Sequence, residues 1–306
     1  MPSFAAVLAA NAANAPKAIR PVAVIVGGTA GVGASIAQVL AERTHGRSHI
    51  VLIGRNEAAA NDIIAKLPKA VDGGRYEFVQ CDVSSMRNVG EATKQLSERL
   101  DKINYLVMTA GILSMAGRRP TEDGVDFKLA LHYYSRFKFA RDLAGLVESA
   151  AEKGEPARVM SVYDSKRGGP IFLDDMALEK NYSLSNAANV GITYNNAALV
   201  ELAKRHPTVS FIHAYPGIVK TNITSGLPLA VRLGLNLVSP FIGVKPIDCA
   251  ENMVYSLFEP TVGKPGAYFR DDVGNEVPRS SYLTPEVLQK VWQHSIQVTD
   301  PRRDSA

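Results

Sequence analysis

The stretch VAVIVGGTAGVGASIAQVL, residues 22–40, decides the fold. Its first five residues form an apolar, β-branched run that predicts a buried parallel strand, and residues 34–40 have the periodicity of a helix. Between them lie Gly27, Gly31 and Gly33. Glycines at a strand-to-helix turn let the backbone approach a ligand, and the first turn of the helix offers free N–H groups. The stretch therefore predicts a pyrophosphate-binding loop, with Thr29 and Val32 as further contacts.

The same alternation of short apolar runs and helical segments continues along the chain. Strands joined by helical crossovers form a parallel sheet that is covered on both faces, and right-handed crossovers make it doubly wound. We therefore expect a doubly wound α/β fold of the Rossmann type. The expected strands are 22–26, 49–53, 77–80, 103–108, 158–162, 209–213 and 267–270, and the expected helices are 34–40, 57–67, 86–100, 123–150, 185–205, 246–258 and 284–298.

Two segments lie outside this alternation. Residues 1–20 form an Ala-rich N-terminal extension, in which we expect a short helix that packs on the domain. Residues 222–244 contain two prolines, several glycines and many apolar side chains, and we expect them to form a substrate lid. Residues 21–306 are expected to form a single Rossmann-like domain. The extension has no early Lys or Arg, which argues against a secretory signal, so we expect a cytoplasmic protein.

Composition excludes several classes of protein. The 306 residues are 46% hydrophobic and 21% charged, which excludes a disordered chain. The net charge of +4 points to no nucleic-acid partner, and no apolar run reaches the ~20 residues of a membrane span. The two cysteines, Cys81 and Cys249, form neither a disulfide framework nor a metal motif. A small-molecule substrate is the expected partner, and a homo-oligomer remains open.

Arg55 lies 22 residues after Gly33, where such folds place the residue that contacts the adenosine ribose. An acidic residue there would bind a free 2′-hydroxyl. Gly54 and Arg55 instead present a small residue and a guanidinium, which can hold a 2′-phosphate. The sequence therefore favours NADP as the cofactor, with Asn56 as a neighbouring contact.

Several motifs resemble those of the short-chain dehydrogenase/reductase family over nearly the whole chain. Beyond the glycine loop, four further segments carry the resemblance. Residues 121–126 resemble the family's stretch before its fourth helix. The resemblance implies hydride transfer between a nicotinamide and a carbonyl or alcohol carbon. It also implies cofactor contacts from the other three segments, which supply Asp82, Val83, Ala110, Gly111, Pro216, Gly217 and Thr221.

The sequence departs from the family at the catalytic residues. The family uses a Tyr to protonate the developing alkoxide and a Lys one helical turn later to lower the pKa of that Tyr. Counting from the flanking motifs, these positions hold Ala188 and Ile192, and the position of the family's Ser holds Asp164. The family's Asn on the fourth helix is replaced by His132. The candidates to replace the missing acid are Tyr182, Ser165, Tyr163 and His132.

Two functions follow from this combination. The first is an NADP(H)-dependent oxidoreductase that acts on a carbonyl or alcohol of an apolar small molecule. The second is a non-redox protein of the same fold, such as a cofactor-binding module, an isomerase or a cyclase, because the Tyr–Lys pair is missing. A weaker third possibility, membrane association through residues 227–244, is set against the expectation that this stretch is a lid.

Overall fold

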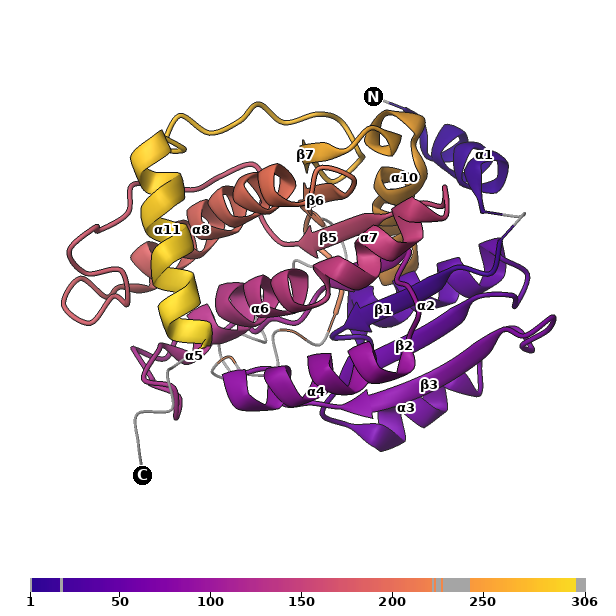
Figure 1. The fold of residues 1–306 in the computed structure, drawn as a ribbon, viewed down its shortest axis with the longest axis horizontal. Helices are drawn as coiled ribbons and strands as arrows, with labels where there is room; N and C mark the ends of the chain where they lie inside the picture. Colours follow the sequence, from indigo (N-terminus) through magenta and orange to yellow (C-terminus); the bar gives the residue numbers. More distant parts are fainter. Residues whose placement is uncertain (1, 17–18, 222, 224–226, 228–242, 301–306) are drawn as a thin grey trace.

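Seven parallel strands form one sheet at the centre of the molecule (Figure 1). The computed structural model describes residues 2–16, 19–221, 223, 227 and 243–300. The strand order is β3-β2-β1-β4-β5-β6-β7, so the direction of winding reverses between β1 and β4. The strands are β1 Val22–Val26, β2 His49–Gly54, β3 Arg75–Gln80, β4 Tyr105–Met108, β5 Arg158–Val162, β6 Ser210–Ala214 and β7 Gly266–Arg270. The expected doubly wound α/β fold is confirmed.

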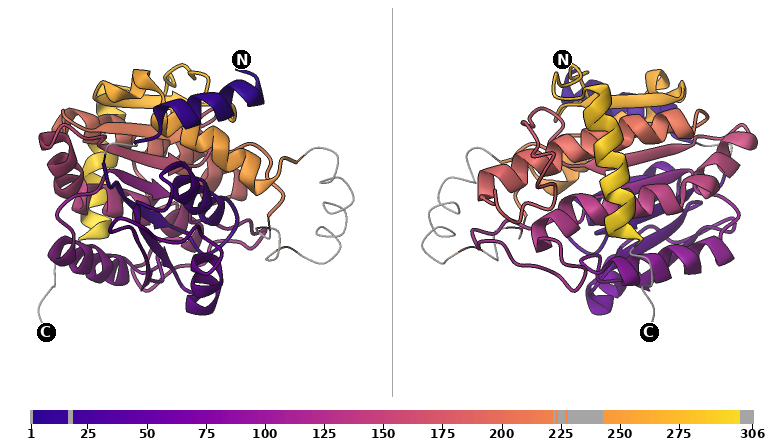
Figure 2. Two further views of the ribbon diagram at one scale, coloured as in Figure 1. Left: turned by 90° about the vertical axis from the view of Figure 1, so that its right-hand side faces the viewer. Right: turned by 60° about the vertical axis from the view of Figure 1, so that its left-hand side comes forward.

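Helices cover both faces of the sheet (Figure 2). α2, α3 and α10 pack on one face, and α4, α6, α7 and α8 pack on the other. The helices are α1 Phe4–Asn14, α2 Gly31–Arg43, α3 Glu57–Ile64, α4 Met86–Arg99, α5 Phe127–Leu129, η1 Ala130–Tyr134, α6 Ser135–Asp142, α7 Ala144–Glu152, α8 Leu184–Arg205, α10 Pro246–Phe258, η3 Pro260–Gly263 and α11 Pro285–Thr299.

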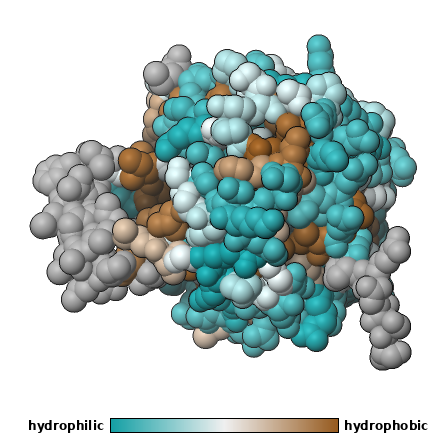
Figure 3. Space-filling model, turned by 90° about the vertical axis from the view of Figure 1, so that its left-hand side faces the viewer, coloured by the Kyte–Doolittle hydropathy of each residue, from teal (hydrophilic) through white to brown (hydrophobic). Residues whose placement is uncertain are grey.

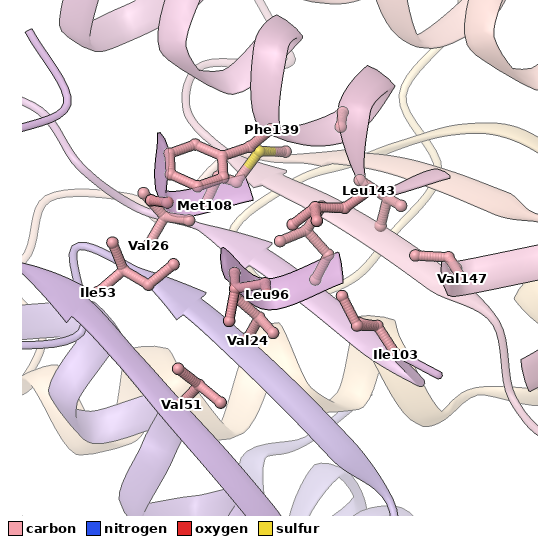
Figure 4. Packing of buried hydrophobic residues seen from close by; sticks show 14 of the residues in the cluster. Val24, Val26, Val51, Ile53, Leu96, Ile103, Met108, Phe139, Leu143 and Val147 are labelled. Atoms are coloured by element: carbon pink, nitrogen blue, oxygen red, sulfur yellow. The ribbon is translucent and has the colours of Figure 1, made fainter. Parts of the chain in front are cut away.

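The central strands β1 and β4 are apolar throughout because both of their faces are buried, whereas the edge strand β3 carries the polar residues Arg75, Glu77 and Gln80. In β1, Val24 and Val26 pack under α4 and α6, while Ala23 and Ile25 pack on the side of α2 and α10. Figure 4 shows the first of these layers, where Leu96 of α4 lies close to Val24 of β1. Successive side chains of a strand point to opposite faces, so a continuous apolar run is what a doubly covered strand requires.

The helix expected over residues 123–150 is wrong in two respects. It begins only at Phe127, because the buried carboxylate of Asp126 accepts the backbone N–H groups of Lys128 and Leu129 and so caps the helix there. It is also interrupted. η1 is a π-helical turn in which the N–H of Ser135 reaches the carbonyl of Ala130, and the helix breaks again at Leu143. Hydrophobic periodicity does not reveal either interruption.

The ends of the described chain are docked on the core. The short N-terminal helix is present as α1, which packs on α10. α11 lies across α8 and α6 on the outside of the other layer (Figure 1). Most of the lid expected over 222–244 lies outside the described residues. Among the described helices, none combines the length and the apolarity needed to cross a bilayer.

Candidate active site at the carboxyl edge of the sheet

The glycine loop after β1 is packed directly against the end of β4. Gly27 has a φ of 84°, and a Cβ there would lie 2.6 Å from the backbone nitrogen of Ala110. A Cβ on Gly33 would lie 2.4 Å from the carbonyl oxygen of Gly27 and 2.6 Å from the hydroxyl oxygen of Thr109. No side chain fits at either position. The loop therefore sits at the point where the winding reverses, which is where open α/β sheets bind ligands.

The first turn of α2 has backbone donors to offer to a ligand. Its N-cap residue, Ala30, provides no side-chain hydrogen bond. The free N–H groups and the positive end of the helix dipole favour an anion at this position. Gly31 adopts a φ of 53°, and a Cβ there would lie 3.1 Å from the methyl group of Thr221. The loop is thus bordered by the segment that follows β6, as the sequence motifs suggest.

On the other side of the loop, Arg55 follows β2 beside Thr29. A Cβ on Gly54 would lie 2.7 Å from the hydroxyl oxygen of Thr29, so a larger residue here would have to displace the Thr29 side chain. The Arg55 side chain is exposed, and in the described part of the chain its guanidinium makes no hydrogen bond or ion pair. It borders a cavity of about 540 Å³ whose walls include Gln80, Asp82 and Asn88.

The other predicted cofactor residues near this cavity are held by local contacts. Asn56 caps α3 by accepting the N–H of Ala59, and this occupies its side-chain carbonyl. Asp82 accepts the backbone N–H and the hydroxyl of Ser84, which fixes the orientation of its carboxylate. Val83 is buried in the core. Among the residues that line this cavity, Arg55 is therefore the one that offers a positive charge to a ligand.

On the β4 side of the loop, the predicted contacts border the candidate catalytic residues. A Cβ on Gly111 would lie 3.2 Å from Nε2 of His132. Pro216 and Gly217 follow β6, where Cys249 Sγ donates to the carbonyl of Pro216 at 3.3 Å and Gly217 adopts a φ of 73°. The sheet edge therefore brings together segments from β1, β4, β5 and β6.

The family's Tyr and Lys positions on α8 carry no acid. Ala188 is exposed and Ile192 is buried. Tyr163, the first residue after β5, approaches the same helix face. Its hydroxyl lies beside Gly191, where a Cβ would be 3.8 Å away. The Tyr163 phenol thus lies close to α8 between Ala188 and Ile192, the positions of the family's Tyr and Lys, although Tyr163 itself follows β5.

His132 contacts Tyr163 and has a defined tautomer. The backbone N–H of Ile112 donates to its Nε2 at 3.0 Å, and its Nδ1 lies 3.5 Å from Oη of Tyr163, a long contact. Burial, reinforced by the charge of Arg136, lowers the pKa of His132 to about 3, so the ring is neutral near pH 7. A neutral ring that accepts at Nε2 carries its proton on Nδ1, and this N–H faces the oxygen of Tyr163.

Arg136 is a buried residue of this site that sequence reasoning missed. Its guanidinium donates to Ser161 Oγ and the Val162 carbonyl, each at 2.8 Å, and to the Ala110 carbonyl at 2.7 Å. Its central carbon lies 5.3 Å from the ring centre of Tyr163. Arg136 follows His132 by four residues, a spacing that places both on one side of a helix, and this was the available signal.

Two other predicted catalytic residues lie in different surroundings. The hydroxyl of Ser165 is buried and donates to the carbonyl of Arg270 at 2.5 Å, which ties it to the end of β7. Oη of Tyr182 receives a 2.7 Å hydrogen bond from Nζ of Lys128, which also donates to two carbonyls of the loop after β4. Tyr182 and Lys128 form a Tyr–Lys pair assembled from separate segments.

Comparison with known proteins agrees with the fold. Residues 21–230 match the protein family described as short chain dehydrogenase. Oxidoreductase AN1596 of Emericella nidulans is 39% identical over 91% of this chain and 92% of its own length. Human polyprenol dehydrogenase is 25% identical over 91% of this chain and 84% of its own. The alcohol dehydrogenase of Thermococcus sibiricus, solved with 5-hydroxy-NADP, superposes with a TM-score of 0.56 at 20% identity, and the match covers 87% of this chain and 99% of that chain.

The chain therefore belongs to the short-chain dehydrogenase family. The fold of this family binds NAD(P) nucleotides, and its members act on small molecules. The names of the relatives support an oxidoreductase function. In the described part of the chain, no three His, Cys, Asp or Glu side chains are arranged to hold a metal ion.

Proposed function

We propose that this protein is an NADP(H)-dependent oxidoreductase that interconverts a carbonyl and an alcohol on an apolar small molecule. The observation that carries the proposal is the glycine loop, where Gly27 and Gly33 have no space for a side chain and an uncapped helix begins. A loop this closely packed lets its backbone N–H groups approach a diphosphate and donate to it. When bound, the nicotinamide supplies the hydride in reduction and accepts it in oxidation.

The preference for NADP rests on Arg55. Its guanidinium is exposed beside the adenosine-side cavity and has no partner among the described residues. A guanidinium binds a phosphate with two parallel hydrogen bonds, which a ribose hydroxyl cannot match. Asp82 also lines the cavity, and its carboxylate accepts a hydrogen bond from the hydroxyl of Ser84. We therefore expect NADPH to bind more tightly than NADH.

Tyr163 is the acid that we propose for the reduction. The N–H at Nδ1 of His132 faces the phenol oxygen, so this oxygen accepts and its own proton is directed elsewhere. The proton is then available to a substrate oxygen that lies beside Gly191. Burial raises the pKa of Tyr163 to about 12, so the phenol remains protonated near pH 7. His132 orients this acid and stays neutral.

Tyr182 is the competing acid, and a direct comparison separates the two. Its oxygen already accepts from a lysine ammonium, so it also has a free proton to donate. It lies before the first turn of α8, whereas Tyr163 lies at the end of β5 next to the family's catalytic positions. We place Tyr182 at the rim of the substrate site rather than at the reacting carbon.

An apolar substrate is suggested by the surface around this edge. Leu113 and Met115 after β4 and Ile218 after β6 are exposed by 44%, 55% and 57%. Apolar side chains also form patches within a mostly hydrophilic surface on the side that carries α11 (Figure 3). Exposed apolar residues gathered at a ligand-binding edge favour an apolar ligand. The relative named polyprenol dehydrogenase is consistent with such a substrate.

The test combines coenzyme binding with turnover. Calorimetry with NADPH and NADH measures binding, and loss of NADPH absorbance is then followed with a panel of apolar aldehydes and ketones. In the Tyr163→Phe variant we expect kcat to fall roughly 100-fold or more, as general acids typically contribute, with NADPH affinity unchanged. Tyr182→Phe serves as the matched control and should retain kcat within a few-fold. The reverse pattern would assign the acid to Tyr182, and failure to bind either coenzyme would contradict the proposal.

A non-redox function is the second candidate, because Ala188 and Ile192 replace the family's acid pair. It predicts tight NADPH binding without consumption of the coenzyme by any carbonyl or alcohol. Under that function Tyr163→Phe would leave coenzyme consumption at zero while abolishing an isomerisation or cyclisation. The same calorimetric and absorbance measurements therefore separate the two candidates.

A further inference from the structure

Arg136 is a buried cation without an acidic partner in the described part of the chain. Its side chain is 3% exposed, and all three groups that accept from it, Ser161 Oγ and the carbonyls of Val162 and Ala110, are uncharged. An isolated charge is costly to bury, so such residues persist where the charge has a use. Burial lowers the pKa of Arg136 to about 10, which still leaves it charged near pH 7.

The groups around Tyr163 show which one can use this charge. His132 and His213 lie at ring distances of 5.0 and 6.3 Å from Tyr163, and burial keeps both of them neutral. Asp164 is adjacent, but its carboxylate is engaged by Arg167 at 2.9 Å. The remaining group is the phenol, whose ring centre is 5.3 Å from the guanidinium carbon. The positive charge therefore favours the ionised form of Tyr163 over the neutral form.

The guanidinium is also rigidly placed. Ser161, which accepts from Arg136, donates to Oδ1 of Asn195 at 2.9 Å, and Nδ2 of Asn195 donates to the carbonyl of His132 at 2.8 Å. This chain of hydrogen bonds links the end of β5, α8 and η1. A fixed charge needs no reorganisation when a neighbouring group ionises, which is what makes a preorganised site effective.

We infer that Arg136 stabilises the tyrosinate that Tyr163 becomes when it protonates the substrate. This inference rests on the proposed function. The O–H bond of Tyr163 breaks and its electron pair stays on the phenolate oxygen, while the proton forms an O–H bond with the substrate oxygen. The substrate carbon is the atom that receives the hydride from the reduced coenzyme. Arg136 thus acts through Tyr163 as a positioning residue and supplies the charge that Ile192 cannot.

The decisive measurement does not depend on turnover. Site-specific replacement of Tyr163 by a difluorinated tyrosine gives a more acidic phenol whose ionisation is followed by fluorine NMR in the coenzyme-free protein. The Arg136→Met variant removes the charge, and Arg136→Lys retains it. We expect the midpoint of ionisation to rise by about one pH unit or more in Arg136→Met, equivalent to a tenfold weaker ionisation. In Arg136→Lys the midpoint should change much less.

Ser161→Ala is the control for a merely structural role. It removes one hydrogen-bond partner of Arg136 and keeps the charge, and the carbonyls of Val162 and Ala110 still hold the guanidinium, so it should lower stability and shift the midpoint much less than Arg136→Met does. If Arg136→Met does not fold, Arg136→Gln provides the same comparison with a polar side chain. Equal midpoints in a folded charge-removed variant and in the parent protein would overturn the inference, whatever the rate measurements show.

Rates supply a second readout that also isolates the proposed function. Arg136→Met should lower kcat for reduction about 10-fold or more with KM unchanged, and it should cause no further loss in a Tyr163→Phe background. Equal losses in both backgrounds would mean that Arg136 does not act through Tyr163. Absence of turnover in the parent protein would contradict the proposed function, and the NMR titration would still test the influence of Arg136 on Tyr163.

Discussion

Gly33 shows how the absence of one side-chain carbon lets the glycine loop pack closely at the candidate site. A methyl group there would lie 2.4 Å from the carbonyl oxygen of Gly27, and neither backbone can move without displacing the β1 loop. We expect Gly33→Ala to destabilise the fold by about 1–3 kcal/mol, the usual effect of overpacking, and to abolish coenzyme binding. Urea unfolding and calorimetry check the two effects.

The matched control for this change is Gly145→Ala. Gly145 is an exposed residue of α7, and no heavy atom lies within 4 Å of the position that its Cβ would occupy. Alanine has the higher helix propensity, so this variant should be more stable than the parent by about 0.4–1 kcal/mol. Similar changes in stability for Gly33→Ala and Gly145→Ala would mean that the glycine loop has room for a methyl group at Gly33.

Arg55 should decide which coenzyme binds. Replacement by Gln removes a charged donor from the adenosine-side cavity, and a hydrogen bond to a charged group contributes about 1.5–3 kcal/mol. We therefore expect Arg55→Gln to weaken NADPH binding roughly 10- to 100-fold and to leave NADH binding nearly unchanged. Calorimetry with both coenzymes measures the ratio. Arg75→Gln, at the opposite edge of the sheet and 64% exposed, is the control and should alter neither affinity.

The pH dependence of the reaction should reflect the pKa of Tyr163. That pKa is raised to about 12 by burial, with the charge of Arg136 opposing, so the protonated form dominates at lower pH. Reduction uses the protonated phenol, and its rate should stay constant from about pH 7 to about pH 9, below the pKa of Arg136. Oxidation uses the phenolate, and its rate should rise about tenfold per pH unit over the same range. Steady-state rates in both directions check this. A loss of the reduction rate with a midpoint below about pH 9 would assign the proton to a different group.

Individual site residues differ in how far the sequence could predict them. The glycines and Arg55 are local in sequence to the strands that they follow, so spacing alone indicates their role. Tyr163 and His132 could be proposed as candidates, but their contact joins residues from β5 and η1 that are far apart in the chain. The role of Arg136 depends on carbonyls of two other strands, which periodicity cannot reveal. Tertiary proximity, not residue type, defines this part of the site.

α1 is held on α10 by one polar cluster rather than by a broad apolar face. Nδ2 of Asn11 donates to the Glu251 carbonyl at 2.9 Å and to Oε2 of its carboxylate at 2.6 Å, and Arg43 of α2 pairs with the other carboxylate oxygen at 2.5 Å. Both Asn11 and Glu251 are buried. A single side chain of α1 therefore connects it to two core helices.

Asn11→Ala should detach this helix. The change leaves Oε2 of the buried Glu251 carboxylate without the hydrogen bond from Asn11, which typically costs about 1–3 kcal/mol. We expect faster hydrogen exchange across Phe4–Asn14 and a lower midpoint of urea unfolding. Asn14→Ala, at the exposed end of the same helix, should leave both measurements unchanged. Protection of α1 that is unaltered in Asn11→Ala would mean that apolar contacts such as that of Val7 suffice.

The sequence predicted which helices and strands exist better than it predicted the residues at which they begin and end. All seven strands occur within a few residues of their expected positions. The central strands are the most readily predicted because buried parallel strands are continuous apolar runs, as in β1 and β4. The helix expected over 123–150 is divided because the position of its start depends on the buried carboxylate of Asp126. The cap is formed by the Asp126 side chain and the backbone N–H groups of Lys128 and Leu129. The apolar periodicity extends beyond this cap, so it does not indicate where the helix begins.

For the whole molecule, buried histidines make stability depend on pH. Burial lowers the pKa values of His132 and His213 to about 3 and that of His294 to about 4, against about 6.5 in an unfolded chain. A lowered histidine pKa means that the unfolded state binds more protons below pH 6.5. The contribution to stability is therefore complete above about pH 6.5 and is lost progressively as the pH falls towards the folded-state values.

We expect the free energy of unfolding to fall by about 1–2 kcal/mol per buried histidine between about pH 6.5 and about pH 5. Carboxylates with lowered pKa values, such as Asp175 and Glu201, lose stability only at lower pH, so they do not affect this range. Urea unfolding at several pH values measures the slope. His213→Gln should reduce it by about a third, whereas His45→Asn, at an exposed position, should leave it unchanged. A slope of zero in the parent protein would contradict neutral burial of these rings.

The π-helical turn at Ala130–Tyr134 fixes the number of residues between the Asp126 cap and Arg136 as well as the shape of the helix. It accommodates one residue more than an ordinary helical turn, and everything after it is rotated accordingly. Because each helical residue advances by about 100° around the axis, inserting one further residue here would swing Arg136 away from the strand ends that it bridges. Insertions are thus not tolerated between the Asp126 cap and Arg136, even where the intervening side chains could be exchanged. The number of residues in this interval is itself part of the site.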